Sequence, residues 1–392
     1  MSITKPSLFP TKQTKIIATI GPATSSSEML EQLLLAGMNV VRINASHGDH
    51  ETHKQTIANI RKLDEELGSS TSILVDLQGP KLRIGELEGD EINLEEGAVL
   101  RIKVGAERGC AGVVYTNYES FAKDVKPGES VLLDDGKMKV EVVSTDSDSE
   151  VVCKVIYGGV LKPRKGINLP DTEISLPCIT EKDERDLAFA LKHNADWIGL
   201  SFVRNPNDIE QLRHRIDAEG KHTRIIAKIE KPEAVEMLDE IIEITDAVMI
   251  ARGDLGVEIP MEEVPLLQRK IIDKCRSASR PVIIATQMME SMIESSTPTR
   301  AEVNDVATAV LDGTDAVMLS AETSVGKYPV HTVKAMCQII KNMEANNDRA
   351  FNERPPYNPD DDRFITDSIC YNACRLARRT KAAAIVTMTY SG

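Results

Sequence analysis

Short apolar runs alternate with longer segments of helical period along most of this sequence. The apolar runs are rich in β-branched residues, which is typical of buried strands. The segments between them place apolar residues every three or four positions, as amphipathic helices do. Eight such runs predict β-strands over Thr14–Ile20, Asn39–Ser46, Thr71–Gln78, Asp196–Val203, Thr223–Glu230, Asp246–Arg252, Arg280–Thr286 and Asp315–Ser320.

The pattern also predicts helices that alternate with these strands: Ser27–Ala36, Asp49–Gly68, Glu181–Asn194, Asn207–Glu219, Glu233–Ile244, Val264–Ser277, Arg300–Leu311 and Val330–Glu344. Strand–helix units in series indicate parallel strands joined by crossover helices. Eight strands are the number that closes a (β/α)8 barrel, so we predict an α/β fold with a TIM barrel. An open, doubly wound sheet is the alternative, because periodicity does not prove closure.

The helical period disappears between residues 85 and 176. Short alternating runs separated by Gly, Pro and Asp turns predict an inserted all-β domain there. This domain follows the third barrel strand, at the face where barrel active sites lie, which favours a mobile lid over a passive insertion. The predicted boundaries are 1–84 and 177–349 for the barrel catalytic domain and 85–176 for the β-barrel-like lid domain.

The end of the chain breaks the rhythm again. A polar, Pro-rich linker over Asn352–Asp362 is followed by a predicted helix, Thr366–Arg379, and an apolar run, Ala382–Met388. Residues 350–392 are therefore predicted to be a linker and the truncated start of a C-terminal α/β domain.

Charge and composition narrow the classes of partner. The formal net charge of -14 argues against nucleic-acid and anionic-membrane partners, since both select basic surfaces. No apolar run approaches the roughly 20 residues that a membrane-spanning helix needs. The seven cysteines are scattered without a CxxC pair, which is typical of reduced thiols. We therefore expect a cytoplasmic protein that binds neither membrane nor nucleic acid.

Polar residues gather where the predicted strands end. Seven strands carry them: Arg42, Asn44, Ser46 and His47; Asp76; Ser201; Lys228 and Glu230; Arg252, Gly253 and Asp254; Thr286 and Gln287; Ser320 and Glu322. Because the carboxyl ends of barrel strands meet at one rim, this clustering predicts a single active site there.

The chemistry of this rim is coherent. Glu230 and Asp254 are hard oxygen donors on adjacent strands, which suits one Mg²⁺ that keeps waters and binds substrate oxygens. Lys228 lies on the same strand face as Glu230, and with Arg42 it indicates an anionic substrate. Such a cation can stabilise the charge that develops in phosphoryl transfer. Two alternatives stay open: a metal-free acid–base pair of carboxylates, and a purely structural salt bridge of Lys228.

Nine motifs in consistent order resemble the pyruvate kinase family: TIGPAT (Thr19–Thr24), NVVRINASHG (Asn39–Gly48), DLQGPKLR (Asp76–Arg83), KGINLP (Lys165–Pro170), AKIEKPEAV (Ala227–Val235), ARGDLGVEIP (Ala251–Pro260), ATQMMESM (Ala285–Met292), PTRAEVNDVA (Pro298–Ala307) and DGTDAVMLSAET (Asp312–Thr323). The resemblance runs from about Lys12 to Gly392. It implies transfer of the phosphoryl group of phosphoenolpyruvate to ADP, giving pyruvate and ATP in the final step of glycolysis.

The resemblance also implies roles for single residues. Glu230 and Asp254 would bind Mg²⁺, with Mn²⁺ as a possible substitute, and Lys228 would stabilise the transferring group. Arg42, Gly253 and Thr286 would contact the substrate, with Thr286 near the path of the proton delivered to the enolate. The remaining implied roles are nucleotide binding by Asn44, Ala45, Ser46, His47, Arg83 and Lys165, and support of the site by Ser201, Ser320 and Glu322.

Two features depart from the family pattern. The family's monovalent-cation site corresponds to Asn44, Ser46, Asp76 and the carbonyl of Leu77, but the motif usually has Thr at the position of Leu77 and Glu at that of Lys81. Since the Lys81 ammonium can substitute electrostatically for potassium, we expect that K⁺ is not required.

The second departure is the chain end, because the family's C-terminal domain continues beyond Gly392 and carries its effector site and part of its subunit interface. The full-length protein is expected to be a homotetramer, and the truncation to impair allostery and assembly. Two other functions remain open at this point: a metal-dependent aldolase or lyase with the same carboxylate pair, and a binding protein without turnover.

Overall fold

The computed structural model describes residues 8–346, 355–356, 363–382 and 384–387. These residues divide between two compact units, Met1–Ala345 and Asn346–Gly392, and each is described by itself. Among the described residues, no helix combines the length and the apolar character needed to cross a membrane.

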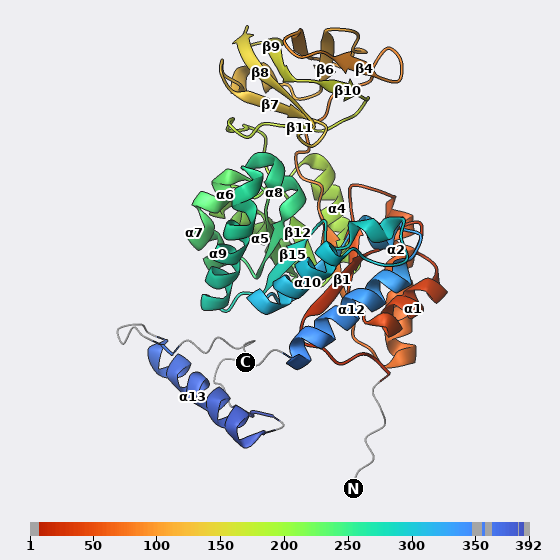
Figure 1. Cartoon of the computed structure of the whole chain (residues 1–392), viewed down its shortest axis with the longest axis vertical. Helices are drawn as coiled ribbons and strands as arrows, with labels where there is room; N and C mark the ends of the chain where they lie inside the picture. Colours follow the sequence, from red (N-terminus) through yellow and green to blue (C-terminus); the bar gives the residue numbers. More distant parts are fainter. Residues whose placement is uncertain (1–7, 347–354, 357–362, 383, 388–392) are drawn as a thin grey trace. The chain divides into compact units, whose positions relative to one another are not determined.

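The core of the first unit is a closed barrel of parallel strands in the order β1-β16-β15-β14-β13-β12-β3-β2 (Figure 1). The strands are β1 (Lys15–Thr19), β2 (Val40–Asn44), β3 (Ser72–Asp76), β12 (Trp197–Leu200), β13 (Arg224–Ile229), β14 (Ala247–Ala251), β15 (Val282–Ala285) and β16 (Ala316–Leu319). Closure through the β1–β16 pair confirms the predicted barrel and excludes the open sheet.

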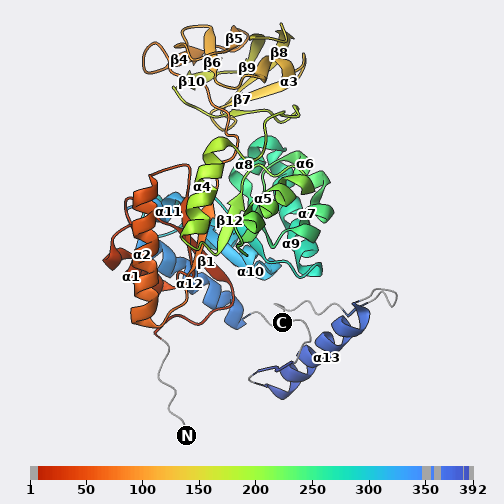
Figure 2. The same ribbon diagram turned by 180° about the vertical axis from the view of Figure 1, so that it is seen from behind.

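Helices surround the barrel strands in both views (Figures 1 and 2). They are α1 (Ser27–Ala36), α2 (His50–Leu67), α4 (Glu181–Lys192), α5 (Pro206–Ala218), α6 (Pro232–Glu236), α7 (Leu238–Ile244), α9 (Val264–Ser277), α10 (Arg300–Asp312) and α12 (Pro329–Asn346). The predicted helix Glu233–Ile244 is divided at Met237 into α6 and α7. Two short helices were not predicted, α8 (Arg252–Glu258) and α11 (Ala321–Ser324). The helix α8 begins directly after β14, and α11 begins one residue after β16 and is too short to show a helical period.

The barrel strands are buried on both faces, as expected for parallel strands covered by helices. One apolar cluster fills the barrel with side chains that include Ile17, Leu74 and Met249. A larger cluster joins the opposite face of the strands to the helices. The apolar residues therefore form a rigid frame, and the polar residues that follow each strand are held at its rim.

The chain leaves the barrel after β3 and forms a separate β-structure before it returns at α4. Its elements are β4 (Ile92–Leu94), β5 (Val99–Val104), β6 (Val113–Thr116), α3 (Phe121–Asp124), β7 (Ser130–Leu133), β8 (Met138–Thr145), β9 (Glu150–Tyr157), β10 (Gly159–Leu161) and β11 (Ile167–Asn168). They form a six-stranded sheet, β11-β7-β8-β9-β5-β6, and the pair β10-β4. This region, called the lid below, has its own apolar core around Phe121. The exact domain boundaries stay a prediction.

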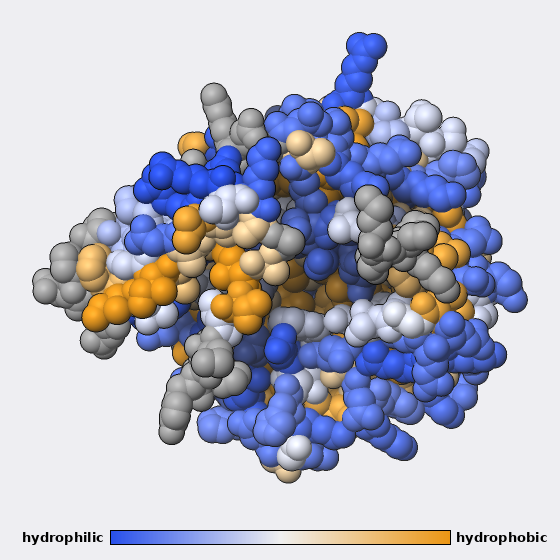
Figure 3. Space-filling view, turned by 90° about the horizontal axis from the view of Figure 1, so that it is seen from below, coloured by the Kyte–Doolittle hydropathy of each residue, from blue (hydrophilic) through white to orange (hydrophobic). Residues whose placement is uncertain are grey.

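In the second unit, the helix predicted over Thr366–Arg379 is present as α13 (Phe364–Thr380). The apolar run that we predicted after it, Ala382–Met388, has no assigned strand at residues 382 and 384–387, while residues 383 and 388 lie outside the described part. Large apolar side chains of this unit are exposed, namely Ile365, Ile369, Leu376, Ile385 and Val386. Hydrophobic residues, in orange, lie at the surface on the left of Figure 3.

Candidate active site

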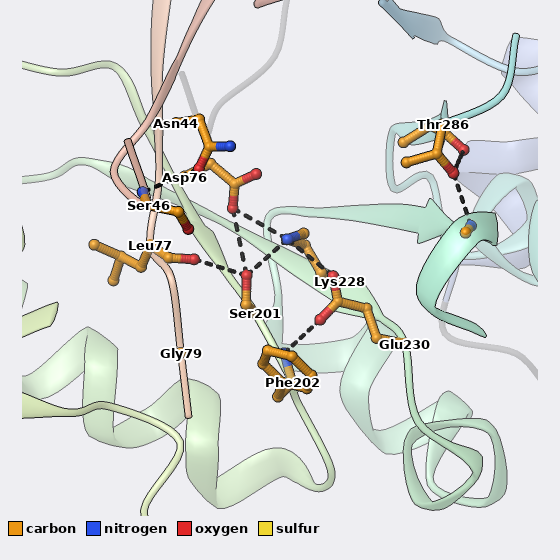
Figure 4. A network of polar contacts seen from close by, with 12 residues as sticks. Asn44, Ser46, Asp76, Leu77, Gly79, Ser201, Phe202, Lys228, Glu230 and Thr286 are labelled. Atoms are coloured by element: carbon orange, nitrogen blue, oxygen red, sulfur yellow. Dashed lines mark hydrogen bonds and ion pairs between the residues drawn. The ribbon is translucent and has the colours of Figure 1, made fainter. Parts of the chain in front are cut away.

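A buried cluster of charged side chains lies where β2, β3 and β13 end (Figure 4). The Lys228 ammonium lies 2.8 Å from Glu230 Oε1 and 3.2 Å from Asp76 Oδ1. It also donates a hydrogen bond of 2.6 Å to Ser201 Oγ. Arg42 binds the other oxygen of Asp76 through two nitrogens, Nε at 2.8 Å and Nη2 at 2.6 Å. The structure therefore brings together five of the residues that the sequence placed at the rim.

The charges in this cluster stabilise one another. Burial opposes ionisation of Asp76, but Lys228 and Arg42 outweigh this effect and hold the pKa of the carboxyl below its usual value. Burial likewise opposes the Lys228 ammonium, but Asp76 and Glu230 outweigh it and raise the pKa of Lys228 above its usual value. Lys228 is thus a permanent cation in a buried position, where its field is less screened than at the surface.

Glu230 has a different balance of forces. Burial raises the pKa of its carboxyl, Lys228 opposes that rise, and the negative charge of Asp254 adds to it. The second oxygen of Glu230 accepts a hydrogen bond of 2.8 Å from the backbone N–H of Phe202. Phe202 has a left-handed backbone (φ 55°), and a Cβ at Gly79 would lie 2.7 Å from its ring. The glycine of the DLQGPK motif therefore allows the loops after β3 and β12 to pack closely.

Glu230 and Asp254 are the two carboxylates that the sequence suggested as ligands of a divalent metal. Within the described part of the chain, no group of three or more His, Cys, Asp or Glu side chains is placed to hold a metal ion. Mg²⁺ needs only one or two carboxylates when substrate oxygens and waters complete its shell. The negative charge of Asp254, in the first turn of α8, repels that of Glu230 and raises the pKa of its carboxyl. A cation between them would relieve this repulsion.

Thr286 lies in a second part of the rim, apart from the Lys228 cluster in Figure 4. The backbone N–H of Gly253 donates a hydrogen bond of 2.8 Å to Thr286 Oγ1. A Cβ at Gly253 would lie 3.3 Å from this oxygen, so the close approach favours glycine. Thr286 has a positive φ of 65°, and Arg252 donates to its carbonyl at 2.7 Å. Glu322 supports the same loop, because its carboxylate accepts the backbone N–H groups of Met289 (3.2 Å) and Ser320 (2.7 Å).

The residues implied in nucleotide binding lie in two places. Asn44 is paired with Asp76 in the barrel, and its side chain accepts the backbone N–H of Ser46 at 3.1 Å, which shapes the turn that continues to His47. Lys182 of α4 holds this turn by donating to Ala45 O at 2.5 Å.

The other place is the base of the lid. Arg83 forms a β-bridge with Gly166 and donates a hydrogen bond of 3.0 Å to the carbonyl of Arg164. Lys165 is paired with Asp134 at 2.8 Å. Arg83 and Lys165 therefore lie on adjoining segments.

The oxygens expected to bind potassium already have partners. Both oxygens of Asp76 contact cationic side chains, and the carbonyl of Leu77 accepts a hydrogen bond of 2.7 Å from Ser201. Lys81 lines a pocket together with Asp254, between the base of the lid and the barrel.

Sequence reasoning missed some contacts of the site. Thr19, at the end of β1, accepts a hydrogen bond of 2.9 Å from Arg42, so the one strand without a predicted polar end contributes as well. The motif TIGPAT could have indicated it. The backbone donor of Phe202 has no sequence signal, because every residue except proline carries one. The buried pair Lys231–Glu258 was also missed.

Comparisons with known proteins agree on one family. The family model described as "Pyruvate kinase, barrel domain" matches residues 11–333. The chain is 47% identical over 381 residues to a pyruvate kinase of Corynebacterium glutamicum, which covers 97% of this chain and 79% of that protein. It is 46% identical over 384 residues to one of Mycobacterium tuberculosis, covering 97% and 80%. A solved pyruvate kinase structure from Cryptosporidium parvum is similar with a TM-score of 0.87 at 39% identity, covering 95% of this chain and 77% of that one.

Proposed function

The chain belongs to the pyruvate kinase family, whose enzymes transfer the phosphoryl group of phosphoenolpyruvate to ADP, and we propose that Lys228, Glu230 and Asp254 are the centre of this transfer. The observation that carries the proposal is the buried Lys228 ammonium, held between Asp76, Glu230 and Ser201. Its raised pKa keeps it charged, so it can stabilise the negative charge on the transferring phosphoryl oxygens.

The family implies a divalent metal, and Glu230 and Asp254 would hold it as Mg²⁺ or Mn²⁺. When bound, the ion would act as a Lewis acid on the oxygens of the substrate. Arg42 would bind the phosphate, since a guanidinium suits bidentate contacts with phosphate oxygens. In the structure this guanidinium is already oriented by Asp76 and Thr19.

Gly253 and Thr286 would contact the enolate side of the substrate. The hydroxyl of Thr286 donates to Ala285 O (2.7 Å) and accepts from the N–H of Gly253 (2.8 Å), so its orientation is fixed before substrate binds. We place this hydroxyl near the path of the proton that converts the enolate to pyruvate. Asn44, Ala45, Ser46, His47, Arg83 and Lys165 would bind ADP, the last two from the base of the lid.

Potassium is not needed in this proposal. The oxygens of Asp76 and the carbonyl of Leu77 already contact Arg42, Lys228 and Ser201, so a monovalent cation there would have to share them with these partners. The Lys81 ammonium would supply the missing positive charge at the same rim. The homotetrameric assembly that the family implies also remains a proposal for this chain.

One assay tests the catalytic assignment. Phosphoenolpyruvate, ADP and Mg²⁺ are mixed and pyruvate is followed with a coupled dehydrogenase. We expect Lys228→Met to lower kcat by at least about 10²–10³-fold while phosphoenolpyruvate binding, measured by calorimetry, is retained. Lys228→Arg keeps the charge but changes its position, so it separates geometry from charge.

The outcomes distinguish the competing functions. Cleavage of another oxoacid without ATP formation would indicate a lyase, and binding without turnover in the unchanged protein would indicate a binding protein. Full activity of Lys228→Met would refute the assigned role of this lysine. Circular dichroism of each variant checks that loss of the buried cation has not unfolded the barrel.

A further inference from the structure

A second buried ion pair lies beside the active site but does not belong to it. Lys231 and Glu258 are 3% and 6% exposed, and the Lys231 ammonium lies 2.9 Å from Glu258 Oε2. Lys231 follows the end of β13, and Glu258 is the last residue of α8. A buried pair of this kind is costly to form, and it is weak evidence for stability alone. Its position therefore needs another explanation.

The lid supplies the third member of this group. Asn168, in lid strand β11, donates a hydrogen bond of 2.8 Å from Nδ2 to Glu258 Oε1. The Lys231 ammonium also contacts the backbone carbonyl of Leu169, the next lid residue, at 3.5 Å. Within the described residues, Glu258 Oε2 has no partner with hydrogen-bond geometry, so Lys231 holds it by charge alone. Two barrel segments and one lid segment therefore meet at a single carboxylate.

Each of these residues is close in sequence to a group of the proposed active site. Lys231 follows Glu230 directly. Glu258 lies four positions after Asp254 on the same helix, which is about one turn. Asn168 lies three positions after Lys165, the lid residue implied in nucleotide binding.

We propose that Lys231, Glu258 and Asn168 form a latch. This latch sets the position of lid segment 165–169, called the lid arm below, relative to the barrel carboxylates. The three residues are positioning residues. The latch acts on the nucleotide side of the site, because Lys165 is the group whose distance it controls, whereas Arg42 and Lys228 belong to the barrel. The effect of the latch on nucleotide binding rests on the proposed function, but its structural role does not.

The lid has another attachment that does not depend on the latch. Arg204 donates hydrogen bonds to the carbonyls of Ile174 (2.5 Å) and Leu176 (2.9 Å), on the segment that returns to α4. Breaking the contacts of the latch should therefore loosen the lid arm without detaching the lid from the barrel. Asn168 is the best residue to replace, because its removal leaves the Lys231–Glu258 pair intact and no buried charge without a counter-charge.

The experiment combines hydrogen exchange with kinetics. In Asn168→Ala, we expect the segment 166–169 to exchange about tenfold faster, as fits loss of one hydrogen bond to a charged group, while β13 exchanges unchanged. The KM for ADP should rise by a similar factor, and the KM for phosphoenolpyruvate should not change. Asn93→Ala, at an exposed asparagine of lid strand β4, is the matched control.

A rescue separates the latch from general damage to the lid. Asn168→Asp places two carboxylates side by side and should loosen the arm more than Asn168→Ala does. Adding Glu258→Gln should restore slow exchange and the low KM for ADP, because the new amide donates to the carboxylate introduced on the lid while Lys231 still has one carboxylate nearby. Unchanged exchange in Asn168→Ala, or no rescue in the double variant, refutes the latch. Faster exchange in Asn168→Ala, and its reversal in the double variant, without any kinase activity in the unchanged protein would refute the proposed function instead.

Discussion

At the scale of single residues, Asp76 is the carboxylate that binds two of the positive charges at the rim. One of its oxygens is bound by Arg42 and the other by Lys228, and burial makes both contacts strong. The neighbouring Leu77 has no side-chain oxygen to offer a cation, and its carbonyl is taken by Ser201. A potassium ion would have to share these oxygens with their present partners. We propose that the ammonium of Lys81, which lines the neighbouring pocket, takes its place.

We therefore expect steady-state activity in buffer free of sodium and potassium to match that in KCl. Lys81→Met should lower activity in this buffer by about tenfold, as fits loss of one nearby charge at a partly screened site, and KCl should restore part of it. Lys81→Arg, which keeps the charge, should stay independent of KCl. A large stimulation of the unchanged protein by KCl would show that Lys81 does not replace the ion.

The residues of the site differ in how far sequence could predict them. Lys228 and Glu230 are two positions apart on a strand, so their common face was predicted and their 2.8 Å contact follows. Lys231 is one position further and leaves that face. Its partner Glu258 lies 27 positions later, and Asn168, which donates to Glu258, lies 63 positions before Lys231, so no local pattern pairs these residues. Pairings between distant segments depend on the packing of the lid on the barrel, which periodicity does not contain.

At the scale of elements, the start of α10 shows how a local capping motif also holds a loop of the barrel rim. Thr299 and Glu302 form a capping box: Thr299 Oγ1 accepts the N–H of Glu302 at 3.2 Å, and Glu302 Oε2 accepts that of Thr299 at 2.7 Å. Glu302 also accepts two hydrogen bonds from Ser291, so the cap ties the loop after β15 to the helix. The same helix presents Asp305 to Arg252.

Glu302→Gln should lower the free energy of unfolding by about 1 kcal/mol at pH 7, a melting-point decrease of roughly 2 °C. Burial opposes the charge of Glu302, but the hydrogen bonds from Ser291 and Thr299 hold its pKa below the usual 4.5. A lowered carboxyl pKa stabilises the fold above the unfolded value and loses this effect as pH falls through the folded one. The gap in melting temperature between Glu302→Gln and the unchanged protein should therefore narrow below pH 4.5.

Thermal melts at pH 7, 5 and 4 measure this gap. Glu210→Gln, the same change at an exposed position of α5, should have no comparable effect at any of these pH values. A gap that stays constant down to acidic pH would show that the charge of Glu302 is not what stabilises the cap.

Elements were predicted well where burial is periodic. They were predicted poorly where contacts between distant segments determine the local structure. The barrel strands follow the apolar runs, and capped helices such as α1 and α10 begin at or within one residue of their predicted starts. The helix α8 was missed because its sequence, RGDLGVE, contains two glycines, which are unfavourable in helix interiors. Its start directly after β14 places Asp254 at the rim, so tertiary context overrides the local preference at the site itself.

At the scale of the whole barrel–lid unit, the barrel and the lid have separate apolar cores. The two apolar clusters of the barrel hold the segments that carry Arg42, Lys228, Glu230 and Asp254. The apolar cluster of the lid is separate and contains Phe121, which is fully buried. Because cavities destabilise the core in which they form, damage to one core should be felt mainly in its own part of the chain. Binding of phosphoenolpyruvate and binding of ADP should then be separable by mutation.

Phe121→Ala should destabilise the lid by about 3–5 kcal/mol through the cavity it leaves. Amides of β5, β8 and β9 should then exchange faster, while those of β13 and β14 should keep their protection, since the barrel core is untouched. Phosphoenolpyruvate should still bind, because its proposed contacts are all in the barrel, but turnover should fall as Lys165 loses its place. Hydrogen exchange and calorimetry measure these effects, and faster exchange spread evenly through the barrel strands would show that lid and barrel unfold as one cooperative body.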